Sequence, residues 1–231
     1  MAAIYLIRHG QASLHSENYD QLSPTGERQA VALGAALKQR GIQFDAVYAG
    51  SMRRHAQTAA GCLQAMDCAL APTILDGFNE YDHEEVMARH RPEFSDHLSR
   101  SEYLAKHPNP NKAFQIEFEL ALHRWRMGEY DHEYAETWQH FSQRCTDALD
   151  HVRYNSGNAK SIAVFSSGGP ISIATGSCLG LTDEHIAELS WSIINCSVTC
   201  LLFNSKKMTL RYFNDYSHFE YAEDKSLFTY R

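Results

Sequence analysis

Three short polar or glycine-rich segments of this 231-residue chain contain the residue types that could do chemistry. They are Arg8-His9-Gly10, Arg53-Arg54 and Ser166-Ser167-Gly168-Gly169, and each comes at or just after the end of a run of residues that favours a β-strand. In open α/β sheets, ligands bind at the carboxyl ends of the strands. We therefore expect the three segments to meet at one ligand site.

Two arginines and a histidine at one site point to a phosphoryl ligand. Their positive charges repel one another unless an anion lies between them, and guanidinium groups bind phosphate oxygens in a bidentate way. Gly168 and Gly169, followed by Pro170, can present backbone N–H groups at the start of a helix, which also favours an anion. The same positive charge disfavours protonation of His9 and leaves a neutral imidazole that can act as a nucleophile.

The elements that must position these residues alternate between strand and helix. Apolar β-prone runs predict strands over residues 3–7, 44–49, 161–165, 197–203 and 209–213, the last two as a hairpin. Apolar residues at helical spacing predict helices after Ser23-Pro24 as far as Gly41, over 52–66 and over 171–179. This order predicts an α/β fold with three αβα layers, a mainly parallel sheet and flanking helices.

The segment 76–136 differs from the rest of the chain in composition. It holds 14 of the 28 acidic residues and 7 of the 21 basic residues, and it therefore carries the whole net charge of −7. A helical insertion that covers one end of the sheet as a lid fits this composition, and a simple helical decoration fits it equally well. Because no repeats or linkers are visible, we predict one domain over 1–231 with 76–136 as a helical cap insertion.

The overall composition favours a small molecule as the binding partner. The net negative charge argues against a nucleic acid or an anionic membrane surface as the main partner. Residues 1–8 show no secretory signal, and the apolar runs are far shorter than the roughly 20 residues of a membrane span. The six cysteines are dispersed and contain no CxxC pair, which is typical of reduced core thiols. We expect a cytoplasmic protein.

Taken in order, the motifs resemble those of the histidine phosphatase superfamily, and more narrowly its phosphoglycerate mutase-like branch. The matching segments are Arg8-His9-Gly10, Leu22–Gly26 with Gln29-Ala30, Arg54–Ala59, Phe78–Tyr81 and Ser166–Gly169. An RHG segment alone is common, but its combination with RxxQT after the second strand and SGG after the third is specific. The resemblance covers most of the chain and is weakest over 95–150.

The resemblance implies roles for individual residues. His9 would be the nucleophile and would form a phosphohistidine intermediate, while Arg8 and Arg54 would neutralise the phosphoryl oxygens. Glu80 would protonate the leaving alkoxide and then activate water, although a surface carboxylate is the alternative for this residue. Arg53 competes with Arg54 for its role, but the spacing to the QT pair that follows favours Arg54.

The chain departs from the family pattern at Ser167, where the family has a second histidine that donates a hydrogen bond to the phosphoryl oxygens. Together with Gln11 and Gly168, Ser167 is expected to bind the substrate, and the loss of one charged donor would cost roughly 10²–10³ in rate. Substitution of Ser167 by histidine should then raise hydrolysis. His218 and His83 are candidates to replace the missing histidine, and a structural role is the alternative for both.

These features predict a phosphatase that hydrolyses a small phosphomonoester through a phosphohistidine intermediate, with activity reduced by Ser167. The alternatives are a phosphoglycerate mutase-type phosphotransferase and a catalytically weak sensor or interaction protein that binds a phosphate ligand. The acidic segment 76–136 fits a small phosphorylated metabolite or a phosphopeptide better than a polyanion. The remaining histidines lack metal-ligand spacing, and no nucleotide-binding glycine motif is present, so we expect no metal and no cofactor.

Overall fold

The computed structural model of the protein describes residues 1–13, 20–220 and 225–230. It divides into two compact units, of which the first contains Met1–Glu80 and Arg144–Arg231 and the second contains Tyr81–Gln143. The three polar segments at the predicted strand ends all belong to the first unit. Among the helices of the described residues, none is both long enough and apolar enough to cross a bilayer.

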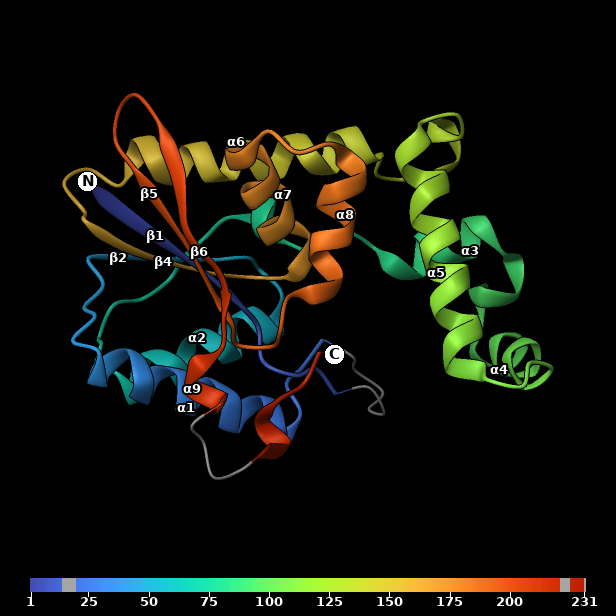
Figure 1. Ribbon diagram of the computed structural model, residues 1–231, viewed down its shortest axis with the longest axis horizontal. Coiled ribbons are helices and arrows are strands. Elements are labelled where there is room, and N and C mark those ends of the chain that lie inside the picture. Colours follow the sequence, from blue (N-terminus) through green and yellow to red (C-terminus); the bar gives the residue numbers. More distant parts are fainter. Residues whose placement is uncertain (14–19, 221–224, 231) are drawn as a thin grey trace. The chain divides into compact units, whose positions relative to one another are not determined.

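A six-stranded mixed sheet forms the centre of the first unit (Figure 1). Its strands are β1 (Ala2–Arg8), β2 (Ala46–Ala49), β3 (Thr73–Ile74), β4 (Ser161–Ser166), β5 (Val198–Phe203) and β6 (Met208–Asp215), and they lie in the order β3-β2-β4-β1-β5-β6. Strands β1 to β4 are parallel, and β5 is antiparallel to both of its neighbours. The prediction of a mainly parallel sheet with a C-terminal hairpin is therefore confirmed.

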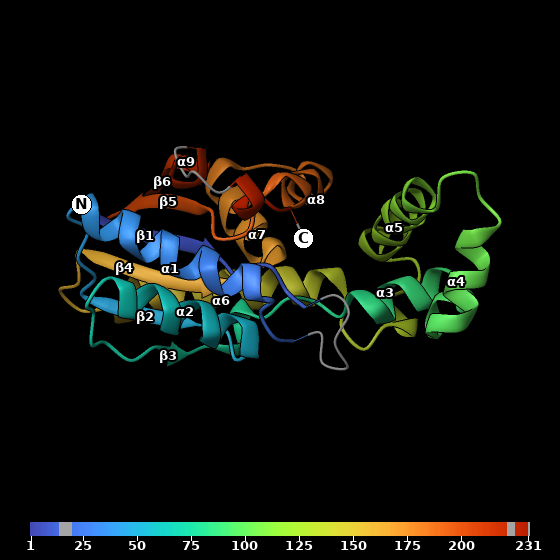
Figure 2. The same cartoon turned by 90° about the horizontal axis from the view of Figure 1, so that it is seen from below.

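Helices cover both faces of this sheet, which gives the three predicted layers (Figures 1 and 2). Helices α1 (Pro24–Gln39) and α2 (Arg53–Ala65) lie side by side on one face, and α6 (Trp138–Asn155) and α7 (Gly168–Leu179) lie on the other. The remaining helices of the first unit are α8 (Asp183–Ser192), α9 (Ser217–Glu220), and the short 3-10 helices η1 (Asp76–Phe78) and η4 (Lys225–Leu227).

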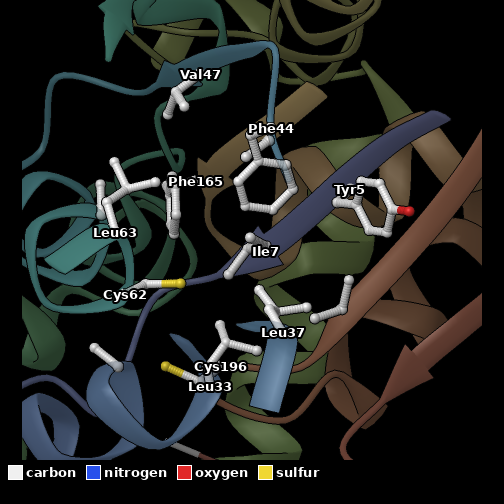
Figure 3. Packing of buried hydrophobic residues seen from close by; sticks show 14 of the residues in the cluster. Tyr5, Ile7, Leu33, Leu37, Phe44, Val47, Cys62, Leu63, Phe165 and Cys196 are labelled. Carbon is white, nitrogen blue, oxygen red and sulfur yellow. The ribbon is translucent and has the colours of Figure 1, made fainter. Parts of the chain in front are cut away.

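Alternate residues of β1 enter two separate cores. Ile7 packs with α1 and α2 in the cluster shown in Figure 3, whereas Ile4 and Leu6 pack in the cluster on the α6 and α7 side. Because side chains of a strand alternate between faces, an apolar run without polar interruptions fits a strand that is covered on both sides. Burial on both faces fixes where β1 ends within the sheet. It thereby also fixes the positions of Arg8 and His9, which lie at that end.

Two predicted boundaries differ from the structure for local reasons. The strand expected from Phe44 begins at Ala46, because the Asp45 carboxylate instead accepts hydrogen bonds from the backbone N–H groups of Lys160 and Ser161 at 2.7 and 2.9 Å. The α1 helix, expected as far as Gly41, ends at Gln39, before the positive φ of Gly41, and it begins at Pro24, where the Ser23 hydroxyl accepts from a first-turn N–H. The short strand β3 and the helix α8 had no counterpart in the sequence prediction.

The second unit is helical and has its own aromatic core. It contains α3 (His83–His90), η2 (Pro92–Ser95), α4 (His97–Ala105), α5 (Pro110–Met127), η3 (Asp131–Glu133) and the first residues of α6. Trp125 is almost fully buried, and its ring contacts those of Trp138 and Phe141 at centroid distances of 5.3 and 5.7 Å. The insertion expected over 76–136 corresponds to a unit bounded at 81–143, and its role as a cap stays a prediction.

Candidate active site

The ends of β1 and β4 lie next to each other in the sheet. Arg8, the last residue of β1, is paired with Ser166, the last residue of β4, and the His9 N–H donates to the Ser166 carbonyl over 2.9 Å. The His9 carbonyl in turn accepts from the side-chain amide of Asn195 over 3.1 Å. The segments that begin at Arg8 and Ser166 therefore meet, as expected from the order of the strands.

The imidazole of His9 is held in one orientation. Its Nδ1 lies 2.7 Å from the carbonyl oxygen of Gly10, and only 5% of the residue is exposed. Burial, followed by the charges of Arg54 and Arg8, lowers the pKa of His9 well below its usual value. A neutral ring that donates from Nδ1 to this carbonyl carries its lone pair on Nε2, which is the atom suited to attack an electrophile.

Of the two neighbouring arginines at the start of α2, Arg54 is the buried one. Its Nη1 lies 2.8 Å from the carboxylate of Asp20, and the Arg54 side chain is 6% exposed. Arg53 is exposed and uses its backbone N–H to bind the same carboxylate. Arg54 is thus the arginine that lies close enough to lower the pKa of His9, and its role at a phosphoryl group stays a prediction.

Thr58 ties the first strand end to α2. Its hydroxyl accepts from the Gly10 N–H over 3.0 Å and donates to the Arg54 carbonyl over 2.7 Å. A side chain at Gly10 would also place its Cβ 2.5 Å from the carbonyl oxygen of Gly26, which excludes any larger residue. These contacts explain why an RHG segment and an RxxQT segment occur together in one site.

Arg8 reaches the C-terminal segment. Its Nη1 donates to the backbone carbonyl of Ile193 and, over 2.9 Å, to that of Tyr230. A Cβ built on Gly168 would lie 3.9 Å from Arg8 Nε, so the start of α7 is next to this guanidinium group. Arg8 therefore links the C-terminal residues to the turn that follows β4.

Glu80 lies at the N-terminus of α7. One of its carboxylate oxygens accepts from the Gly169 N–H over 3.1 Å. The helix N-terminus that was expected to hold an anion thus already has a carboxylate within hydrogen-bond distance, which the helix dipole favours. The position brings Glu80 to the same strand ends as His9 and Ser167, whereas the alternative expectation was a surface carboxylate.

Ser167 is fully buried and bonded to a histidine that the sequence analysis did not single out. Its Oγ lies 2.7 Å from Nε2 of His55, whose ring is centred 5.7 Å from that of His9. Burial and the charge of Arg54 lower the pKa of His55 to about 3. The available indication was its position next to Arg54, at the start of a helix that was already assigned to the site.

The other predicted residues have different surroundings. The Gln11 side chain accepts from the Ser23 hydroxyl over 2.8 Å, which links it to the start of α1. His218, on α9, lies with residues of α1 and with Arg40 around a surface hollow. His83 is the first residue of α3 in the second unit. In the described part of the chain, no group of three or more His, Cys, Asp or Glu residues could hold a metal ion.

Curated proteins match one part of the chain. A broad-specificity phosphatase of Saccharomyces cerevisiae is 37% identical over 76 residues, which cover 30% of this chain and 33% of that protein. A 2,3-bisphosphoglycerate-dependent phosphoglycerate mutase of Lachnoclostridium phytofermentans is 32% identical over 77 residues, which cover 31% of each protein. The chain therefore matches about a third of the length of these relatives.

Solved structures match nearly all of the chain. A phosphoglycerate mutase of Bacillus anthracis superposes with a TM-score of 0.66 at 18% identity, over 94% of each chain. A variant of the phosphoserine phosphatase of Entamoeba histolytica, in complex with phosphoserine, superposes with a TM-score of 0.64 at 15% identity, over 94% of this chain and 99% of that chain. At these identities the likeness establishes a phosphoglycerate mutase-like fold.

The model of the histidine phosphatase superfamily, branch 1, matches residues 4–216. This range runs from β1 into the segment after β6 and includes His9, Arg54, Glu80 and Ser167. The resemblance inferred from the motifs is thereby confirmed. The chain belongs to branch 1 of the histidine phosphatase superfamily.

Proposed function

We propose that the protein hydrolyses small phosphomonoesters through a phosphoryl group carried transiently on His9. The observation that carries this proposal is a buried, neutral imidazole next to two arginines, with its lone pair on Nε2. An imidazole that is held neutral is a ready nucleophile, and two guanidinium groups stabilise the charge that phosphoryl transfer spreads over the oxygens.

The reaction has two steps. His9 Nε2 attacks phosphorus, the bond from phosphorus to the ester oxygen breaks, and a protonated Glu80 gives its proton to the leaving alkoxide. Water then attacks the phosphorus, the P–N bond breaks, Glu80 accepts a proton from the water, and inorganic phosphate leaves. The location of Glu80 at the start of α7, next to the strand ends that carry His9 and Ser167, supports this role.

The net negative charge of residues 76–136 indicates the class of substrate. The segment 76–136 carries the whole net negative charge of the chain and repels polyanions. A small phosphorylated metabolite, or a phosphopeptide with basic neighbours, is the class that we assign to the site. Within this proposal, the helical unit 81–143 acts as a cap that selects the substrate.

A second candidate function has one specific observation in its favour. Ser167 replaces a charged donor, so the pocket can bind a phosphate ligand while it turns over slowly. This would make the protein a sensor or interaction protein with weak activity. A phosphoglycerate mutase-type transfer is less well supported, since a mutase must hold the phosphohistidine against water with fewer charged donors.

The test is turnover of p-nitrophenyl phosphate by the wild type and by the His9→Ala variant, together with an alkaline denaturing quench. We expect the variant to lose turnover and mass spectrometry to find a phosphoryl group on His9 of the wild type. Turnover that survives the substitution would overturn the proposal. Anion binding without turnover in the wild type would favour the sensor.

A further inference from the structure

A pair of fully buried polar side chains lies beside His9. His55 Nε2 and Ser167 Oγ are 2.7 Å apart, and both residues have 0% of their surface exposed. His55 lies in the first turn of α2, and Ser167 occupies the position before α7, so the pair forms only when both helices pack on the sheet. Burying polar groups costs free energy unless they are hydrogen-bonded, and His55 Nε2 and Ser167 Oγ meet that condition through each other.

The sheet register places the backbone of Ser167 next to the strand end that carries His9. The preceding residue, Ser166, is the sheet partner of Arg8 and accepts from the His9 N–H. The ring of His55 is tilted against that of His9 at a centroid distance of 5.7 Å. The Ser167 hydroxyl is therefore next to the nucleophile proposed above.

The contacts of His55 constrain the protons of the pair. Its pKa of about 3 means that the ring is neutral and carries a single N–H. A Gly50 backbone acceptor raises the pKa of His55 and opposes part of this shift, although Nδ1 makes no hydrogen bond of ordinary geometry within the described residues. The ring hydrogen of the free protein can therefore lie on either nitrogen, and a phosphoryl group next to Ser167 shifts it to Nε2.

We infer that His55 is a positioning residue for phosphoryl transfer and acts through Ser167. His55 donates from Nε2 to Ser167 Oγ, and the serine hydroxyl is thereby directed to donate to an oxygen of the phosphoryl group on His9. The inference rests on the proposed function. In this inference, the polar contact beside His9 is formed by His55, which lies in α2, and by Ser167, which directly precedes α7.

The negative charge of a phosphoryl group favours donation from His55 to Ser167 over donation from Ser167 to His55. A phosphoryl oxygen next to Ser167 attracts the hydroxyl hydrogen, and the hydroxyl oxygen must then accept its second hydrogen bond from His55. A ring whose pKa is about 3 is also a poor base, so His55 does not remove the serine proton. Ser167 is consequently a donor to the anion and not a second nucleophile.

The test compares His55→Ala, His55→Gln, Ser167→Ala and the double variant His55→Ala/Ser167→Ala. We expect His55→Ala to lower kcat about tenfold with little change in KM, less than the loss for removal of a direct oxyanion donor. Glutamine keeps a donor amide and most of the volume, so His55→Gln should retain most of the activity. The double variant should be no slower than Ser167→Ala alone, because the two residues act as one unit.

A second readout does not depend on turnover. With inorganic phosphate bound, the ¹⁵N shifts of His55 should report a hydrogen on Nε2, and Ser167→Ala should change them. His218→Ala is the matched control, because it removes another largely buried histidine of the same unit without touching the pair. It should leave kcat unchanged.

Three outcomes would overturn the inference. They are wild-type kcat in His55→Ala, additive losses in the double variant, and a phosphate-bound His55 with its hydrogen on Nδ1. If the proposed function itself is wrong, His9→Ala keeps its turnover, which distinguishes that failure from a failure of the inference about His55. If His9→Ala is inactive and His55→Ala is fully active, only the role of His55 fails.

Discussion

At the scale of single residues, burial separates the groups of the site from their neighbours. Arg53 and Arg54 are adjacent in sequence, yet one is exposed and the other is buried against Asp20 beside His9. Ser167 and His55 are both inaccessible to solvent. The residues that can act on a phosphoryl group are thus fixed by packing, and substitutions there test both chemistry and stability.

The two arginines give the first prediction. Arg54→Ala should weaken the binding of inorganic phosphate by about 1.5–3 kcal/mol for each charged hydrogen bond that is lost. Arg53→Ala is the matched control and should leave the affinity unchanged, because its side chain is exposed. Isothermal titration of phosphate into both variants measures the difference. Equal affinities would mean that Arg54 is not an anion ligand.

The structure changes what we expect from histidine at position 167. The space beside Ser167 is already filled by His55, and an added ring in a tightly packed site costs typically about 1–3 kcal/mol. Ser167→His alone should therefore lower the melting temperature and should not raise turnover. The exchange variant His55→Ala/Ser167→His should recover stability and phosphatase activity relative to Ser167→His. A single variant that is both stable and faster would contradict this packing argument.

At the scale of elements, the sequence predicted those parts of the candidate site that lie at the ends of strands. Apolar runs such as residues 3–7 and 161–165 identify strands, and their parallel order brings Arg8 and Ser166 together. The contact between His55 and Ser167 could not be predicted, because it depends on how α2 is rotated on the sheet. That rotation is set by buried residues such as Cys62 and Leu63, which lie in the same core as Leu33 of α1.

The N-terminus of α7 gives the element-scale prediction. Glu80→Gln keeps an oxygen that can accept from the Gly169 N–H, but it removes the proton donor and the negative charge. Turnover of p-nitrophenyl phosphate should fall by about 10²–10⁴-fold, as expected for loss of a general acid. Competitive inhibition by phosphate should stay as strong or become stronger, since one carboxylate no longer opposes the anion. Undiminished turnover would assign the acid role elsewhere.

At the scale of the whole molecule, the candidate site residues lie in one unit, and most of the excess negative charge lies in the other. His9, Arg54, Glu80 and Ser167 all belong to the unit formed by Met1–Glu80 and Arg144–Arg231. The excess negative charge lies over 76–136, and the other unit, with 12 acidic and 7 basic residues, carries −5 of the net charge of −7. Charge counting located the unusual segment in the sequence, but the boundary at Tyr81 depends on packing around Trp125 and Phe141, which no local pattern reveals.

Buried histidines also couple the stability of the molecule to pH. Burial lowers the pKa of His55 from 6.5 to about 3 and that of His218 from 6.5 to about 4. Below pH 6.5 the unfolded chain therefore binds protons that the folded chain does not bind. The stabilisation is complete above about pH 6.5, decreases as the pH falls, and stops changing once the pH is below the folded pKa of each group.

This sign gives a quantitative prediction for unfolding in urea. Between pH 7 and pH 5, each such histidine should remove about 2 kcal/mol from the free energy of unfolding, whatever its folded pKa below 5. His55→Gln should therefore reduce the difference between the two pH values by about 2 kcal/mol, because glutamine does not titrate. His151→Gln, on the exposed surface, is the control and should leave the difference unchanged. An equal pH dependence in His55→Gln and the wild type would mean that His55 is readily protonated in the folded protein. The Ser167 hydroxyl would then face a cationic donor and not a neutral one.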